Sequence, residues 1–292
     1  MIFLLATIIL TSWLTLSFKL VERFRISNIQ AIVFNYVACV LTGSVVNGSF
    51  PVNTSTFKES WFIWAVVMGT VFIFLFNVIG ITAQQLGVAV ASVANKLSLV
   101  IPFLFSVYLY NEKATVLKIG GIVIALAAVI LSCWPTRHKE PSGKEFKPSL
   151  LIFPIILFIV SGLLDTMIKY VEQAYLNDTN KNDYLITAFA VAASIGLIIL
   201  LLLFASGKEK FDYRAVIAGL GIGIPNYFSI WCLVRVLKDF SGNSSAIIPI
   251  NNMGIVLFST LAAWLFFKEH LSKTNWLGIA LSLIAIALIA YG

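Results

Sequence analysis

The sequence predicts an all-α integral membrane protein with ten transmembrane helices in two inverted five-helix repeats, and three observations carry that prediction. Of the 292 residues, 60% are hydrophobic and only 11% are charged, with a mean hydropathy of +0.96, which is more apolar than soluble domains of this size. Apolar stretches of about 20 residues, enough for a helix to cross a hydrocarbon core of about 30 Å, recur along the chain. Finally, the two halves of the chain align with each other.

The apolar stretches define five helices in each half of the chain. In the first half we expect them at residues 2–20, 29–48, 60–82, 87–110 and 114–134. In the second half we expect them at 149–171, 184–205, 213–236, 243–267 and 273–291. A β-barrel is excluded because runs such as Gly120 to Cys133 are apolar on every side rather than alternating. The opening stretch lacks a basic n-region and a cleavage motif, so we interpret it as a retained helix.

One polar segment divides the chain nearly in half. Residues 135–148 hold the breakers Pro135, Pro141 and Gly143 among mixed charges. We therefore expect a first repeat at 1–134, a linker at 135–148 and a second repeat at 149–292.

The repeat is visible near the end of each half. SVANKLSLVIPFLFSVYLYNEK (92–113) aligns without gaps on PINNMGIVLFSTLAAWLFFKEH (249–270), which places Asn95 on Asn252 and Glu112 on Glu269. The same register places Gly121 on Gly278. Chance similarity of apolar helices explains the Leu and Ile matches, whereas the Asn, Glu and Gly matches favour a repeat. Because each unit has an odd number of crossings, the second unit is inverted relative to the first.

The chain resembles the drug/metabolite transporter superfamily, and in particular its EamA-like ten-helix members. The most specific features are LYNEKATVLKIGGIVIALAAVIL (Leu109 to Leu131) and FKEHLSKTNWLGIALSLIAIALI (Phe267 to Ile289), each with a Glu, a short turn and a Gly-containing final helix. The resemblance covers nearly the whole chain. It implies transport of amino acids, nucleotide sugars, phosphorylated sugars or other metabolites by alternating access through a central cavity.

The formal net charge of +7 marks membrane-flanking loops rather than a nucleic-acid surface. Odd-numbered loops hold twelve basic residues and even-numbered loops hold six, a bias that puts both termini outside the cytoplasm. The family resemblance instead implies cytoplasmic termini, so the orientation stays open.

Cofactors, metals and enzymatic motifs are not expected. Cys39, Cys133 and Cys232 fall in or at the end of different helices, and His138 and His270 lie in loops without companion ligands. The glycines follow no phosphate-binding spacing. They suit close helix approach instead, and they are Gly43, Gly69, Gly80, Gly120, Gly121, Gly254 and Gly278.

Lys96 is the most informative polar residue, because a charge inside the hydrocarbon region costs about 2.5 to 3.5 kcal/mol on insertion scales. It lies about nine residues into the predicted fourth helix, so we expect it to face the bundle interior. Helical spacing puts Ser92, Asn95 and Pro102 near the same face. Pro249, Asn251 and Asn252 form a matching polar cluster in the ninth helix.

Asp165 has two interpretations. It is four residues before Lys169 on the sixth helix and can pair with it, or it faces Lys96 across the cavity and neutralises it or exchanges a proton with it. Further candidate cavity residues are Asn35, Tyr36, Asn77, Asn226 and Tyr227. For these residues, bonding between helices is the alternative role. Glu112 and Glu269 lie at helix-end turns, so we expect them to be structural.

We therefore predict a secondary transporter of a small polar metabolite, such as an amino acid or an anionic solute. The alternatives are a lipid-handling flippase-like protein and a non-transporting assembly factor. Expected partners are the solute and the lipid bilayer, with the chain acting as a monomer or homodimer. Short loops and the absence of a targeting tract indicate a bacterial inner membrane.

Overall fold

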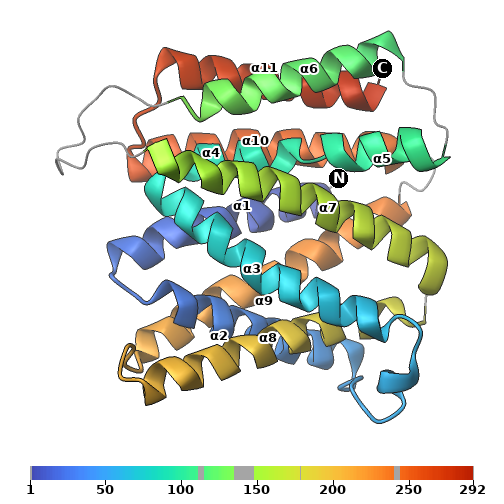
Figure 1. The fold of residues 1–292 in the computed structure, drawn as a ribbon, viewed down its shortest axis with the longest axis vertical. Coiled ribbons are helices and arrows are strands. Elements are labelled where there is room, and N and C mark those ends of the chain that lie inside the picture. Colours follow the sequence, from blue (N-terminus) through green and yellow to red (C-terminus); the bar gives the residue numbers. More distant parts are fainter. Residues whose placement is uncertain (1, 111–114, 135–147, 178, 240–243, 292) are drawn as a thin grey trace. The chain divides into compact units, whose positions relative to one another are not determined.

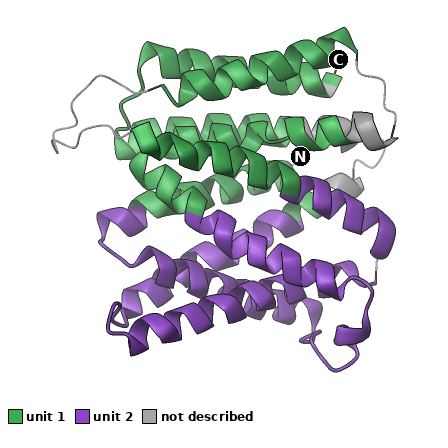
Figure 2. Cartoon of the chain, viewed as in Figure 1, with its two compact units in different colours: residues 1–19, 78–163, 232–292 green, residues 20–77, 164–231 purple. Residues whose placement is uncertain are grey.

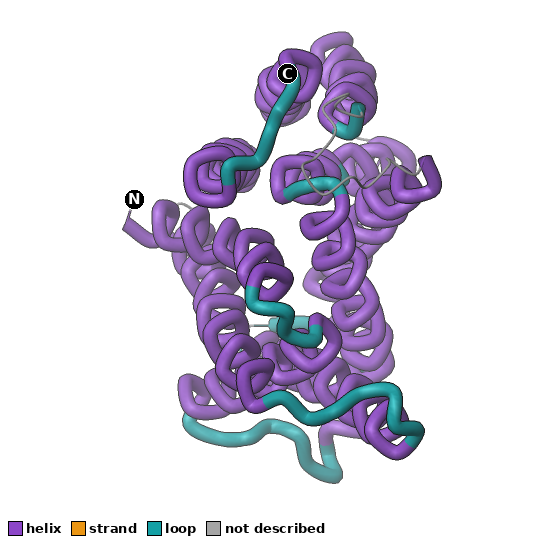
Figure 3. The backbone as a smooth tube through the Cα atoms, turned by 90° about the vertical axis from the view of Figure 1, so that its left-hand side faces the viewer, coloured by secondary structure: helices purple, strands orange, loops and turns teal. Residues whose placement is uncertain are grey.

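The computed structural model describes residues 2–110, 115–134, 148–177, 179–239 and 244–291, and all regular structure in these ranges is helical. Figure 3 shows helices joined by loops throughout this part of the chain. The predicted linker and Glu112 lie outside the described residues, apart from Pro148.

Helices lie at all ten predicted positions (Figure 1). The elements in chain order are α1 (Ile2–Arg23), α2 (Asn28–Asn47), the 3-10 turn η1 (Thr56–Lys58), α3 (Phe62–Gln85), α4 (Val88–Leu97), α5 (Val100–Tyr110), α6 (Val116–Ser132), the 3-10 turn η2 (Pro148–Leu151), α7 (Ile152–Tyr175), α8 (Lys181–Ala205), α9 (Tyr213–Asp239), α10 (Ser244–Phe267) and α11 (Lys273–Tyr291).

Eight helical stretches of the described chain are long and apolar enough to cross a membrane, and the α4–α5 stretch counts as one of them. Helix α6 and the described apolar part of α11 are shorter. The protein is therefore a multi-pass membrane protein, while the count of ten crossings stays a prediction.

The predicted helix at 87–110 is wrong in one respect, because it is two helices. Helix α4 ends at Leu97 and α5 begins at Val100, with a turn at Ser98 and Leu99 between them. Pro102 explains the break: it has no N–H to donate to the Ser98 carbonyl, and its ring crowds that carbonyl in a regular helix. The Ser98 carbonyl instead accepts the N–H of Ile101 at 2.9 Å in a tighter turn.

The chain forms two compact units, each built from both halves of the sequence (Figure 2). Unit 1 comprises residues 1–19, 78–163 and 232–292, and unit 2 comprises 20–77 and 164–231. In each half of the chain, the first and third helices contribute to both units, the second lies in unit 2, and the fourth and fifth lie in unit 1. The compact units therefore do not coincide with the predicted repeats. The helices of the two halves are distributed between the units in the same way.

In unit 1, α6 packs along α11 through two glycines (Figure 1). A Cβ on Gly121 of α6 would lie 2.8 Å from Ile289, and a Cβ on Gly278 of α11 would lie 2.5 Å from the backbone nitrogen of Ser132. Asn275, at the start of α11, donates to the Ser132 carbonyl at 2.9 Å. The start of α11 therefore meets the end of α6, and the two helices are antiparallel.

Helices α4 and α10 form a second antiparallel pair in unit 1. The backbone N–H of Val88, the first residue of α4, donates to the carboxylate of Glu269 at 2.8 Å, two residues beyond the end of α10. Val93, Leu97 and Val256 belong to the buried apolar cluster of this pair, which continues onto α6 and α11.

In unit 2, α2 and α8 are held together at both ends. Gln30, near the start of α2, donates to the Lys210 carbonyl at 2.8 Å beyond the end of α8. Asn47, the last residue of α2, donates to Asp183 near the start of α8 at 3.3 Å. These bonds make α2 and α8 antiparallel.

The glycine predictions are confirmed at most of the described positions. A Cβ would contact Ile186 and Tyr227 at Gly43, Val191 and the Ala188 carbonyl at Gly69, and Ile8 at Gly254, with similar crowding at Gly121 and Gly278. At Gly120 the prediction is wrong, because a Cβ there would meet nothing within 4 Å.

Candidate functional site

The first group of candidate residues lies on two helices that pack against each other, α4 and α10, and we call it the α4–α10 seam: Ser92, Asn95, Lys96, Asn251 and Asn252. Ser92 and Asn251 are buried, with 2% and 4% of their surface exposed. Asn95, Lys96 and Asn252 are half-buried. Ser92, Asn95 and Lys96 are spaced by three or four positions, so they share one face of α4, as the sequence predicts.

Two oxygens of the seam are buried without a hydrogen-bond partner among the described residues. They are Oγ of Ser92 and Oδ1 of Asn251. A buried polar atom without a partner costs about 1 to 3 kcal/mol, so proteins rarely keep one without a use. The seam therefore offers hydrogen-bonding capacity in an otherwise apolar helix pair.

The backbone beside the seam is irregular. The break between α4 and α5 follows directly on Lys96 and Leu97. Helix α7 approaches this break closely, because a Cβ on Gly162 would lie 2.7 Å from the Ser98 carbonyl oxygen. Irregular backbone within a membrane helix is tolerated where it is packed by protein or lines a cavity. In contrast, α10 runs helically through Pro249.

The second group lies in unit 2 where α2 meets α9, and we call it the α2–α9 seam: Asn35, Cys39, Asn226 and Tyr227. The Asn226 amide donates to Oδ1 of Asn35 at 3.1 Å, and both side chains are buried. Cys39 donates to the Gly223 carbonyl at 3.3 Å. Nδ2 of Asn35 is buried and has no hydrogen-bond partner among the described residues.

Glycine brings these helices together. A Cβ on Gly219 would lie 2.8 Å from the carbonyl carbon of Phe34, and one on Gly223 would lie 2.6 Å from Ala38 and against the Asn35 carbonyl oxygen. Helix α9 therefore packs on the backbone of α2, which allows the short side chains of Asn35 and Asn226 to meet.

Tyr36 and Asn77 have structural partners. The Tyr36 hydroxyl donates to the Phe72 carbonyl at 2.7 Å. Its fully buried ring packs against Phe72, Phe76 and Phe189. The Asn77 amide donates to the Ile73 carbonyl of its own helix at 2.8 Å.

Asp165 lies exposed in the part of α7 that belongs to unit 2, whereas Lys96 belongs to unit 1. Its pairing with Lys96, like its pairing with Lys169, stays a prediction.

Sequence reasoning missed how the ends of the helices are held. Glu269 caps a helix, as its expected structural role suggests, but the helix is α4 and not one adjoining its own turn. The signal is the glycine before α4: Gly87 has φ +105 and no side chain with which to cap the helix. In unit 2, Gln30 has a similar role, with Nε2 donating to Glu209 at 3.0 Å and Oε1 accepting the Asp212 N–H at 3.1 Å.

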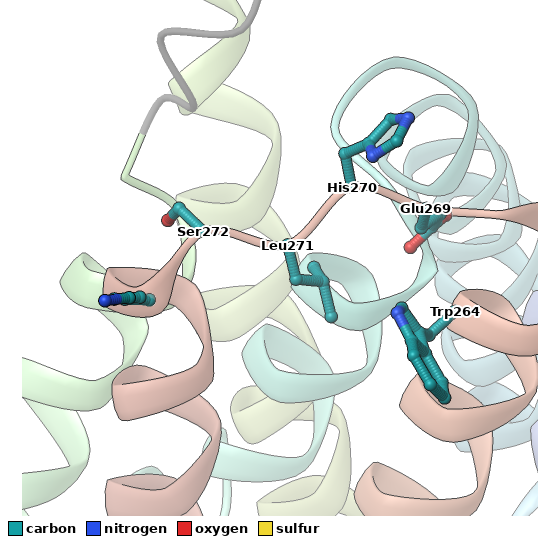
Figure 4. Close-up of a pocket in the computed structure, with 6 residues that line it drawn as sticks. Trp264, Glu269, His270, Leu271 and Ser272 are labelled. Atoms are coloured by element: carbon teal, nitrogen blue, oxygen red, sulfur yellow. The ribbon is translucent and has the colours of Figure 1, made fainter.

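One pocket of about 370 Å³ lies at the turn from α10 to α11 (Figure 4). It is lined by Trp264, Glu269, His270, Leu271, Ser272 and Lys273. No group of three or more metal-ligating side chains occurs in the described part of the chain. This pocket marks the helix-end turn and not the α4–α10 seam.

Apolar helices that are long enough to cross a membrane several times, with polar side chains buried between them, define a multi-pass integral membrane protein. The comparisons give the particular family. Residues 150–291 match the model of the EamA-like transporter family. The second half of the chain is thus similar to EamA-like transporters, and the resemblance to the drug/metabolite transporter superfamily is confirmed.

A relative and a solved structure are similar along almost the whole chain. An uncharacterized protein of Haemophilus influenzae is 26% identical over 282 residues, covering 94% of this chain and 92% of that protein. A crystal structure of a protein matches with a TM-score of 0.57 and 15% identity, covering 98% of this chain and 94% of that one. The latter likeness concerns the fold alone.

Proposed function

We propose that the protein is a secondary transporter of the bacterial inner membrane whose ten helices form two inverted five-helix repeats. It moves a small polar metabolite by alternating access through a central cavity. The family match gives the coarser statement, a membrane transporter. The number of crossings, the repeat, the mechanism and the solute are our inference.

The pairing of equivalent helices is the observation that carries this proposal. The second helices of the two halves (α2 and α8), the fourth (α4 and α10) and the fifth (α6 and α11) pack against each other. Each pair is antiparallel, as the bonds at the helix ends require. Two copies of a five-helix unit related by a two-fold axis in the membrane plane produce this arrangement.

The glycine contacts of α6 and α11 support the same symmetry at the level of single residues. A separation of 157 residues relates Gly121 to Gly278 and also Ser132 to Ile289. Gly121 meets Ile289, and Gly278 meets Ser132. A two-fold rotation that relates residues 157 positions apart therefore converts one contact into the other. Two unrelated apolar helices would not be expected to show this symmetry.

The α4–α10 seam supports a small polar solute. Its buried oxygens on Ser92 and Asn251, which have no partner among the described residues, suit hydrogen-bond donors of a solute. Lys96, on the same face of α4, suits a carboxylate or phosphate. A solute with both kinds of group, such as an amino acid or an acidic metabolite, fits better than an apolar cation.

The test uses purified protein in proteoliposomes and a thermal-shift screen against amino acids, sugar phosphates, nucleotides and cationic drugs. A ligand at 100 times its Kd stabilises the folded state by about 2.7 kcal/mol, which is readily measured. Lys96→Met is expected to abolish both the shift and counterflow of the active solute while the protein still folds.

Lys118→Met is the matched control. Lys118 lies in the first turn of α6, in the same unit, with its ammonium 5.6 Å from the centre of the Phe103 ring. This variant is expected to keep ligand stabilisation and transport. Full activity of Lys96→Met would remove that lysine from the site, and failure of every solute class would favour a lipid-handling or assembly role.

A further inference from the structure

Helix α4 carries three residues of the α4–α10 seam but has weak means of holding its own position. It has only ten residues and is separated from α5 by the turn at Ser98 and Leu99. Its N-cap is Gly87, which supplies no side-chain bond. A helix of this length has marginal stability, because the first four N–H groups lack partners within it.

Glu269 supplies the missing cap from another part of the chain. Its Oε1 accepts the Val88 N–H at 2.8 Å. A negative charge at this end of α4 also interacts favourably with the helix dipole. Gly87 makes the approach possible, since a Cβ there would lie 3.1 Å from Oε2 of Glu269 and would require an unfavourable φ of +105.

The turn that carries Glu269 is itself fixed to α10. Lys268 leaves α10 in the left-handed region with φ +53, and the N–H of Glu269 returns to the Ala263 carbonyl at 3.3 Å. A non-glycine residue holds such a conformation only where its surroundings determine it. Figure 4 shows Glu269 in this turn, on the chain that leads to Leu271 and Ser272.

We propose that Glu269 is a positioning residue for solute binding: it fixes the start of α4 to the end of α10 and so holds Ser92 and Lys96 of α4 in place. This inference rests on the proposed transport function. Ser92 lies one helical turn from the capped Val88, so a shift or fraying of the first turn of α4 moves it directly. Lys96 follows on the same face.

The test compares Glu269→Ala, Glu269→Gln and a control acid in the full-length transporter. Glu269→Ala removes the acceptor and is expected to raise the KM of the active solute about tenfold, with Vmax changed less than about twofold. Glu269→Gln keeps an oxygen that accepts the Val88 N–H and is expected to restore KM to within about threefold of the wild type. If Glu269→Ala gives too little folded protein, Glu269→Asp replaces it, because its shorter side chain retracts the carboxylate.

Glu209→Ala is the matched control, because Glu209 also accepts side-chain bonds at a helix end, from Ser27 and Gln30, but in unit 2. It is expected to leave KM unchanged. A purely structural role for Glu269 would lower the yield of folded protein in both Ala and Gln variants without changing KM, and that result would overturn the proposal.

Hydrogen–deuterium exchange separates this inference from the transport function, because it needs no solute. Glu269→Ala is expected to speed exchange of the amides at 88–91 about tenfold, with little change in α11. Faster exchange in a protein that transports no solute would retain the cap and reject the proposed function. Unchanged exchange in α4 would reject the positioning role even if the protein is a transporter.

Discussion

The two polar seams use the same kinds of residue in different ways. In the α2–α9 seam, Asn226 donates to Asn35 at 3.1 Å, and Cys39 donates to the Gly223 carbonyl at 3.3 Å. In the α4–α10 seam, the buried oxygens of Ser92 and Asn251 have no partner within the described residues. One seam mostly satisfies its own polar groups, whereas the other leaves acceptors available.

This difference distinguishes polar groups that hold two helices together from polar groups that can bind a solute. A hydrogen bond between buried amides stabilises a helix pair, and removing either partner leaves the other with a desolvation penalty. An oxygen without a protein partner contributes nothing to the helix pair, so its retention favours a role toward something else. The comparison supports our proposal that the α2–α9 seam mainly holds helices together and that the α4–α10 seam binds solute. Nδ2 of Asn35, which lacks a partner in the described structure, is the exception within the first.

The largest effect is expected at Gly223. In Gly223→Leu the new side chain would meet the Asn35 carbonyl oxygen and Ala38, which forces α9 away from α2. We expect a loss of about 3 kcal/mol or more of stability, because backbone has to move. Thermal unfolding of the detergent-solubilised protein measures it.

Gly221 provides the control on the same helix. A Cβ there would meet nothing within 4 Å, and replacing a helical glycine by leucine adds about 0.5 to 1 kcal/mol of helix propensity. Gly221→Leu is therefore expected to be neutral or stabilising. Equal damage from both variants would mean that the close approach of α9 to α2 is not what stabilises unit 2.

The second prediction replaces, in separate variants, one asparagine from each seam by leucine. Asn226→Leu strands Oδ1 of Asn35 and is expected to cost about 1 to 3 kcal/mol of stability, with the surviving folded protein still binding solute. Asn251→Leu removes an oxygen that has no partner among the described residues and is expected to change stability by less than about 1 kcal/mol. It is expected to weaken solute binding at least about tenfold.

Thermal unfolding with and without the active solute gives both quantities for each variant. The assignment of roles fails if the pattern is reversed, with Asn251→Leu destabilising the protein and Asn226→Leu abolishing the ligand-dependent shift.

The apolar stretches of the sequence predict most of the helices. Nine of the ten predicted spans coincide with a single helix to within a few residues, because about 20 apolar residues are needed wherever the chain meets lipid. The break between α4 and α5 was missed although Pro102 is visible in the sequence. Proline disrupts a helix in some contexts and not in others, since Pro225 lies inside the continuous α9.

The roles of single polar residues were harder to predict because they depend on partners far away in the sequence. Nothing local distinguishes Asn226, which bonds Asn35 across 191 positions, from Asn251, whose Oδ1 is unpaired in the described structure. The cap on α4 likewise joins Val88 to Glu269 across 181 positions. The matching of Gly121 with Gly278, in contrast, was available from the sequence and falls at a close helix contact.

The smallest expected effect lies outside both seams, at Asp212 before α9. The Arg214 guanidinium donates to this carboxylate, from Nε to Oδ1 at 3.0 Å, and holds the pKa of Asp212 below its ordinary value of 3.8. A lowered pKa in the folded state means that the charged carboxylate stabilises the protein at neutral pH, and that this contribution is lost as the pH falls through the lowered pKa. Asp212→Asn keeps an oxygen for the Arg214 N–H, which Asp212 accepts at 2.9 Å. It removes the charge together with the second carboxylate oxygen, which lies 2.9 Å from Nη2 of Arg214. We expect a slightly lower melting temperature than the wild type at about pH 7, and convergence of the two melting temperatures as the pH falls through the lowered pKa of Asp212. Because the pair is exposed, the difference in melting temperature is expected to be far smaller than that of Asn226→Leu.

A pH-independent difference in melting temperature would mean that the substitution acts through the geometry of the turn before α9 rather than through the charge of Asp212.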